Sequence, residues 1–133
     1  MRIYLAGPSA ELARVREAAA QIEAAGHLIT ERWWEKVADG GVCASDVDHD
    51  ESVLNRAAAD NWLGINRADA AIILCREAGG LSTGAAHEVG WAQARGLDIV
   101  FVGAARGHLA TRWPTPRSIV DTVADAIAIV GAL

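Results

Sequence analysis

The chain has 133 residues, of which 52% are hydrophobic and 22% are charged, and its net charge is −5 at pH 7. This length and composition predict one compact domain over residues 1–133 and argue against a disordered chain. The acidic balance argues against a nucleic-acid polymer as partner, and the lack of a signal peptide or a long apolar run predicts a soluble, cytoplasmic protein without a membrane partner.

The first thirty residues predict a strand, a helix and a second strand. The apolar run at 3–6 ends at Gly7-Pro8, a pair that interrupts regular structure. Apolar residues then recur at helical spacing up to Gly26, which suits a helix end, and residues 27–30 form the next apolar run. The irregular segment that follows begins with two adjacent tryptophans and ends in an acidic loop.

The rest of the chain continues this alternation of elements. A helix is predicted at 51–67, strands at 70–75 and 98–102, a fifth short strand near 109–113, and a closing helix at 117–130. One side of the first of these helices carries Leu54, Ala58, Asn61 or Trp62, and Ile65. The pattern predicts an α/β fold, a doubly wound Rossmann-like or flavodoxin-like parallel sheet of four to five strands with helices on both faces. Ligands of such sheets bind at the carboxyl ends of the strands, where the strand order reverses.

The main candidate site lies in the stretch 79–92, between two of the predicted strands. Its glycine-rich turn leads into a helix that Ser82 or Thr83 can cap. The free N–H groups at the start of such a helix attract an anion. Glu88 follows about one and a half turns later, and small neighbours such as Gly84 leave room for a ligand. We take Glu88 as the candidate catalytic residue, against the alternative of a solvated surface carboxylate.

Four further residues are candidates for the same cleft. If Asp60 reaches it, two carboxylates could divide the work of nucleophile and general acid; otherwise Asp60 is a surface residue. Tyr4 lies in a buried strand, where its hydroxyl needs a partner such as a carboxylate. Trp33 and Trp34 follow a strand end, where they either stack on a base or pack in the core.

No metal site or cofactor is predicted. Alternating aspartates within 46–50 imitate the first ligands of a calcium loop, but Glu51 stands where that loop needs glycine. The turn at 79–84 is not a nucleoside-triphosphate phosphate loop, because no lysine follows its last glycine. Cys43 and Cys75 lack metal-ligand spacing and indicate no disulfide framework.

Three motifs occur together in an order that is typical of one enzyme family. They are Tyr4-Leu5-Ala6-Gly7-Pro8, Asp60 with Ala68-Asp69-Ala70, and Gly84-x-x-x-Glu88-x-Gly90-x-Ala92. Over residues 1–102 the chain thereby resembles the nucleoside 2-deoxyribosyltransferase family, whose relatives include the 2′-deoxynucleoside 5′-monophosphate N-hydrolases.

The resemblance implies a retaining, two-step cleavage of an N-glycosidic bond through a covalent glycosyl-enzyme. It implies that Glu88 attacks the anomeric carbon, that Tyr4 positions this carboxylate and that Asp60 acts at the leaving base. Gly7 at the end of the first strand and the turn before Glu88 would hold the substrate. A neighbouring subunit completes the site in this family, which implies a homo-oligomer, most simply a dimer, with Trp113 as a candidate contributor.

One position bears on the choice between hydrolysis and base transfer. Six residues before the nucleophile, the transferases tend to have an aspartate that contacts the base, and the monophosphate hydrolases a serine that binds the 5′-phosphate. This chain has Ser82, with Thr83 beside it. A hydroxyl at a helix N-terminus suits a phosphate dianion, which favours a nucleotide as substrate. Against this, the Gly7–Ala10 loop lacks the glycine- and arginine-rich character of the hydrolases.

Three alternatives stay open. Nucleoside 2-deoxyribosyl transfer between bases would use the same Glu88. A phosphoribohydrolase of the cytokinin-activating type has a similar glycine-rich signature, although the spacing from Thr83 to Glu88 is longer here and the preceding proline is missing. A nucleotide-sensing module of another class would bind the same ligand without turnover.

Overall fold

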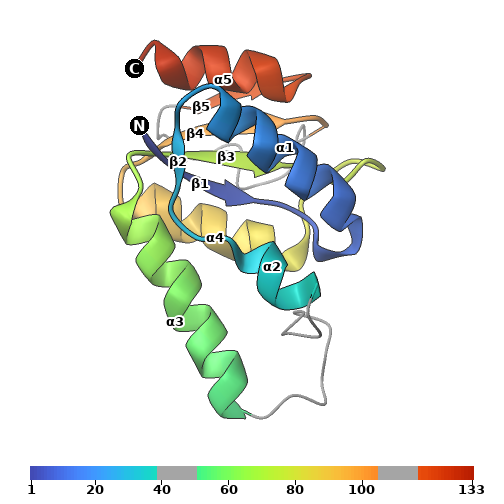
Figure 1. The fold of residues 1–133 in the computed structure, drawn as a ribbon, viewed down its shortest axis with the longest axis vertical. Coiled ribbons are helices and arrows are strands. Elements are labelled where there is room, and N and C mark those ends of the chain that lie inside the picture. Colours follow the sequence, from blue (N-terminus) through green and yellow to red (C-terminus); the bar gives the residue numbers. More distant parts are fainter. Residues whose placement is uncertain (39–50, 105–116) are drawn as a thin grey trace.

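The computed structural model describes residues 1–38, 51–104 and 117–133, which form a five-stranded parallel sheet with helices on both faces (Figure 1). The strand order is β2-β1-β3-β4-β5. The strands are β1 Arg2–Ala6, β2 Leu28–Ile29, β3 Ala70–Leu74, β4 Asp98–Val102 and β5 Arg117–Val120. The α/β fold predicted from the alternation of elements is confirmed, with five strands.

The helices divide into two layers. α1 (Leu12–Ala24) and α5 (Val123–Gly131) cover one face of the sheet, and α3 (Glu51–Arg67) and α4 (Thr83–Ala94) cover the other (Figure 1). The short helix α2 (Trp33–Ala38) follows β2 at the edge of the α1 layer. No helix in the described ranges is both long and apolar enough to cross a membrane.

Alternation along β1 decides which layer each of its side chains meets. Ile3 and Leu5 pack into the core beneath α1 and α5, whereas Tyr4 and Ala6 pack into the core beneath α3 and α4. All four are fully buried. The period of two therefore directs the ring of Tyr4 toward α4, the helix that carries Glu88.

The strand order reverses beside β1. The chain passes from β1 to β2 on one side and then returns to place β3 on the other, with Ile3 opposite Ala70 in the parallel register. The crevice at the carboxyl ends of β1 and β3 is where doubly wound sheets bind ligands. The segments that leave these two ends carry Gly7 and Ser82, respectively.

The C-terminal region differs from the sequence-based prediction. Residues 117–120 form β5 beside β4, where we predicted the first turn of the closing helix; the helix instead begins at Val123. Thr122 caps it, accepting a hydrogen bond from the Asp125 backbone N–H at 3.1 Å. The apolar pair at 119–120 fits a strand and a helix equally well, and tertiary pairing with β4 decides between them. The strand predicted at 109–113 lies outside the described residues.

Candidate active site

The loop between β3 and α4 holds the start of α4 at the edge of the sheet. Gly79 and Gly80 have φ angles of 98° and 76°, which other residues adopt only with strain. The Arg76 backbone N–H donates to the Gly80 carbonyl at 2.9 Å, which closes the turn. Ser82 is the N-cap of α4, and its Oγ accepts from the Ala85 N–H at 3.2 Å, as predicted.

Tyr4 and Glu88 meet between β1 and α4. The Tyr4 hydroxyl donates to Glu88 Oε1 at 2.8 Å, although 84 residues separate them in the sequence. Burial raises the pKa of the Tyr4 hydroxyl well above its ordinary value of 10, and the nearby Glu88 carboxylate raises it further. Tyr4 therefore keeps its proton at neutral pH and acts as a hydrogen-bond donor to Glu88.

Asn61 of α3 is the second donor to the same carboxylate. Its Nδ2 lies 3.1 Å from Glu88 Oε1, the oxygen that Tyr4 also contacts. Both donors use Oε1, and neither contacts the other carboxylate oxygen, Oε2. Two hydrogen bonds to one oxygen also fix the carboxylate in a single orientation.

A glycine on α3 permits this approach. A Cβ at Gly64 would lie 2.7 Å from the Glu31 Cβ and 3.1 Å from a ring carbon of Tyr4. Real Cβ contacts are not as short as the one to Glu31, so α3 lies closer to the segment between β2 and α2 than any other residue would allow, and its distance to Tyr4 of β1 is also tight. Asn61 is three residues away on the same helix face, and this close packing brings it to Glu88.

The electrostatic surroundings of Glu88 set its protonation. Burial raises the pKa of Glu88 from its ordinary value of 4.5 to about 7, while the hydrogen bonds from Tyr4 and Asn61 act in the opposite direction. Near pH 7 a large fraction of the carboxylate is ionised and poorly solvated, which suits a nucleophile.

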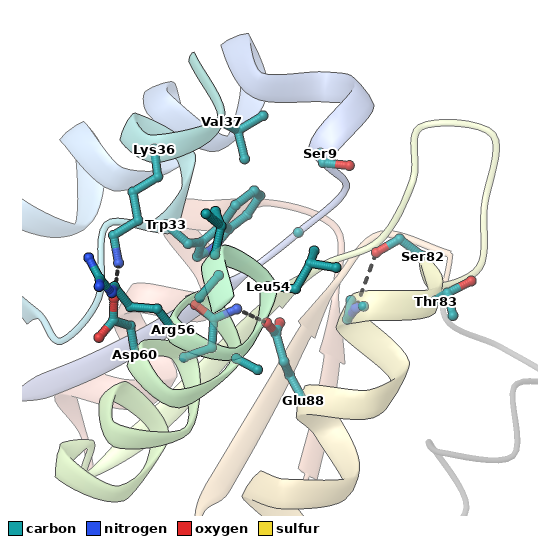
Figure 2. A pocket seen from close by; sticks show the side chains of 17 residues that line it. Ser9, Trp33, Lys36, Val37, Leu54, Arg56, Asp60, Ser82, Thr83 and Glu88 are labelled. Atoms are coloured by element: carbon teal, nitrogen blue, oxygen red, sulfur yellow. Dashed lines mark hydrogen bonds and ion pairs between the residues drawn. The ribbon is translucent and has the colours of Figure 1, made fainter. Parts of the chain in front are cut away.

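Glu88 lies in the wall of a cleft of about 740 Å³ (Figure 2). The start of α4 forms one side of the cleft with Ser82, Thr83 and Gly84, and Gly7 lies at the end of β1. A Cβ at Gly84 would meet nothing within 4 Å, so the backbone there is open to a ligand. The first turn of a helix at this place favours an anionic group.

The opposite side of the cleft is formed by α2 and α3. Trp33 lines it and is fixed by a hydrogen bond from its indole Nε1 to the Leu5 carbonyl at 2.8 Å. Lys36 and Asp60 also line it, and Lys36 Nζ lies 2.6 Å from Asp60 Oδ2. Lys36 Nζ contacts Glu31 as well, at 2.9 Å. Burial lowers the pKa of Lys36, but the hydrogen bonds to Asp60 and Glu31 outweigh it and leave the pKa above its ordinary value.

The structure brings together most of the residues predicted for the site. Tyr4 contacts Glu88 through a hydrogen bond. Six more of them line the cleft together with Glu88: Gly7, Trp33, Asp60, Ser82, Thr83 and Gly84. Trp34 is the exception. It is 1% exposed, packs in the core against the α1 layer and does not line the cleft, because adjacent residues of α2 point in different directions.

Asp60 lies in the cleft wall, but its carboxylate contacts Lys36, and the residue that contacts Glu88 is its neighbour Asn61. Asn61 and Lys36 were not among the residues predicted for the site. A signal existed for Asn61, because helical spacing placed it or Trp62 among the inward apolar residues of 51–67. Trp62 is 50% exposed, so Asn61 is the inward one. No sequence pattern marked Lys36.

The part of the chain that the structure describes holds no cluster of three potential metal-ligating side chains. The acidic stretch at 46–50 and Trp113 lie outside the described residues.

No protein-family model and no curated protein matches the sequence. Among solved structures, the CMP N-glycosidase BcmB from Clostridium botulinum is similar with a TM-score of 0.63 and 16% identity, over 100% of both chains. A conserved protein from Enterococcus faecalis V583 is similar with a TM-score of 0.62 and 17% identity, over 100% of this chain and 99% of that chain. The chain shares the fold of these proteins. The resemblance to the nucleoside 2-deoxyribosyltransferase family is thereby confirmed at the level of the fold.

Proposed function

We propose that the protein cleaves the N-glycosidic bond of a nucleoside 5′-monophosphate, with Glu88 as the nucleophile. The observation that carries the proposal is the geometry at Glu88. Tyr4 and Asn61 both contact one of its oxygens, and Glu88 lines a cleft large enough for a nucleotide. The similarity of the fold to that of a CMP N-glycosidase supports the same reaction class.

The substrate is placed by its phosphate. Ser82 precedes Glu88 by six residues of α4, which corresponds to about 9 Å along the helix axis. A phosphate held by the Ser82 and Thr83 hydroxyls and the N–H groups of the first turn would therefore lie one sugar away from the carboxylate. The sugar would lie over Glu88, with the base toward α2 and α3.

The reaction then proceeds in two steps. Glu88 Oε2 forms an ester with the anomeric carbon as the bond to the base nitrogen breaks, and the electron pair leaves with the base. Tyr4 keeps its proton and stabilises Oε1 while charge moves to the new ester bond. Water then attacks the same carbon, which releases the sugar phosphate and restores the carboxylate. A second base in place of water would give transfer.

Base release from a panel of nucleoside 5′-monophosphates and the matching nucleosides tests this proposal. Each substrate is incubated with and without a second free base, and the products are separated by chromatography. Release from monophosphates, reduced about 10³-fold or more in Glu88→Gln, is the expected result. Exchange into the added base from unphosphorylated nucleosides would instead make the protein a transferase. Tight nucleotide binding without any release would make it a sensor.

The resemblance also implies a homo-oligomer, which we retain as part of this proposal. Exposed apolar side chains on α3, Trp62 and Leu63, are available for a subunit contact. Sedimentation at several protein concentrations measures the oligomeric state, and a dimer is the expected result.

A further inference from the structure

Among the described residues of α3, one side chain contacts Glu88 and the residue before it contacts Lys36. The side chain that contacts Glu88 from α3 is the amide of Asn61, which has no acidic proton to give. Asp60, one residue earlier, is held in an ion pair with Lys36 at 2.6 Å. In this contact Asp60 Oδ2 accepts the hydrogen bond and Lys36 Nζ donates it. The member of this pair that can donate a hydrogen bond to a leaving base is therefore the Lys36 ammonium.

Lys36 has the position and the free hydrogen-bonding capacity to be that group. An ammonium carries three N–H donors, of which Asp60 and Glu31 each accept one, and the third is taken by neither. Lys36 lines the cleft from α2, three residues after Trp33, so the two side chains share a helix face. A planar base with one face on the Trp33 ring would have an edge toward the Lys36 ammonium.

The place of this pair relative to Glu88 fits a leaving base. Figure 2 shows Lys36 and Asp60 on the side of the cleft away from Ser82 and Thr83, with Glu88 in the part between them. Neighbouring residues of α3 link the Lys36 end of the cleft to Glu88, since Asp60 contacts Lys36 and the adjacent Asn61 contacts Glu88. A nucleotide with its phosphate at the start of α4 would therefore direct its base to Lys36.

We propose that the Lys36 ammonium stabilises the departing base by donating a hydrogen bond to the acceptor atom next to the glycosidic nitrogen, which is the C2 oxygen of a pyrimidine or N3 of a purine. This inference rests on the proposed function. As the bond from the anomeric carbon to N1 breaks, its electron pair passes to N1 and spreads onto the C2 oxygen, where Lys36 meets the charge. Glu88 Oε2 forms the new bond to carbon, and the base anion takes its proton from water. In a purine the electron pair passes to N9 and spreads onto N3, which occupies the same place beside the glycosidic nitrogen, so one donor there can serve either class of base.

Kinetics on leaving bases of graded acidity test this role. The substrates are 5-fluoro, unsubstituted and 5-methyl pyrimidine monophosphates, each with a ribose or 2′-deoxyribose, together with purine monophosphates. In Lys36→Met we expect kcat/KM to fall about tenfold for the 5-fluoro substrate and about a hundredfold for the 5-methyl one, because a poorer leaving group needs more stabilisation. Lys36→Arg keeps the charge and should keep the wild-type dependence on leaving-base acidity. Glu35→Gln, which removes an ion pair of α2 with Arg32 outside the cleft, is the matched control. It should change neither kcat/KM nor its dependence on leaving-base acidity.

Two results would overturn the inference while leaving the proposed function in place. One is an equal loss across the substrate series in Lys36→Met, which would give Lys36 a structural role only. The other is a Lys36→Arg variant whose dependence on leaving-base acidity matches that of Lys36→Met and not that of the wild-type protein. Absence of base release from every nucleotide with wild-type protein would contradict the proposed function itself, and the inference with it.

Discussion

Replacing Glu88 by glutamine should stabilise the protein above neutral pH, and this prediction tests the surroundings of Glu88 without any substrate. The glutamine keeps the size of the side chain and an oxygen that can accept from Tyr4 and Asn61. It removes a charge that burial makes unfavourable. Catalytic residues commonly cost stability in this way, because a site suited to the reaction is not optimal for the folded state.

The magnitude follows from the two pKa values of Glu88. The ordinary value is 4.5 and the value in the folded protein is about 7, so the folded state binds the proton more tightly than the unfolded chain does. Stability therefore falls as the pH rises from 4.5 to 7 and stays lower above 7. At 1.36 kcal/mol for each pH unit, the difference is about 3 kcal/mol. Below pH 4.5 both states are protonated and the effect vanishes.

Urea unfolding of the wild-type protein and Glu88→Gln, followed by tryptophan fluorescence between pH 4 and 8.5, measures this difference. We expect the variant to gain about 3 kcal/mol in the free energy of unfolding at pH 8, and little at pH 4. The free energy of unfolding should fall with rising pH in the wild-type protein, whereas in the variant it should depend less on pH. A difference that is constant across this pH range, or a variant that is less stable at pH 8, would refute a buried carboxylate with a raised pKa.

Further predictions concern the pH dependence, the packing and the phosphate end of the site. The kcat/KM for base release should rise with pH to a plateau with an apparent pKa of about 7, since Glu88 must be ionised to attack. Tyr4→Phe removes a hydrogen bond that lowers the pKa of Glu88, so the midpoint of this pH profile should move to higher pH. An unmoved midpoint would show that Tyr4 does not contact Glu88. Gly64→Ala should lower stability by about 1–3 kcal/mol in thermal unfolding and reduce activity, whereas Gly90→Ala, whose Cβ meets nothing within 4 Å, should be neutral or stabilising. Ser82→Asp keeps a helix cap but adds a negative charge, so it should preserve the melting temperature and raise KM for monophosphates at least about tenfold. A KM for monophosphates that is the same in the variant and in the wild-type protein would exclude phosphate binding at Ser82.

The elements that place the site could be predicted because their sequence signals are local. Continuous apolar runs mark the buried strands β1, β3 and β4. The serine that caps α4 follows a glycine-rich turn, a pattern that predicts a helix start from a few residues. Because parallel strands bring their carboxyl ends to one edge, the chain order alone placed Gly7 near Ser82.

The contacts inside the site were harder to predict, since they depend on rotation about helix axes. Adjacent residues of a helix point about 100° apart, so the sequence could not decide between Asp60 and Asn61 as the residue facing Glu88. The same rotation sends Trp33 to the cleft and Trp34 to the core. At Gly64, α3 packs closely against Glu31 and the Tyr4 ring, and this tertiary contact, which helps to place Asn61 near Glu88, has no local sequence signal.

The central claim, that Glu88 attacks the sugar, is tested most directly by mass spectrometry of the protein during turnover. The probe is the best-cleaved 5′-monophosphate with fluorine at C2′, which slows hydrolysis of the glycosyl ester. After acid quenching, we expect an adduct with the mass of the sugar phosphate on the peptide that contains Glu88, with one base released for each adduct. Base release without an adduct, or an adduct on a different residue, would contradict the claim.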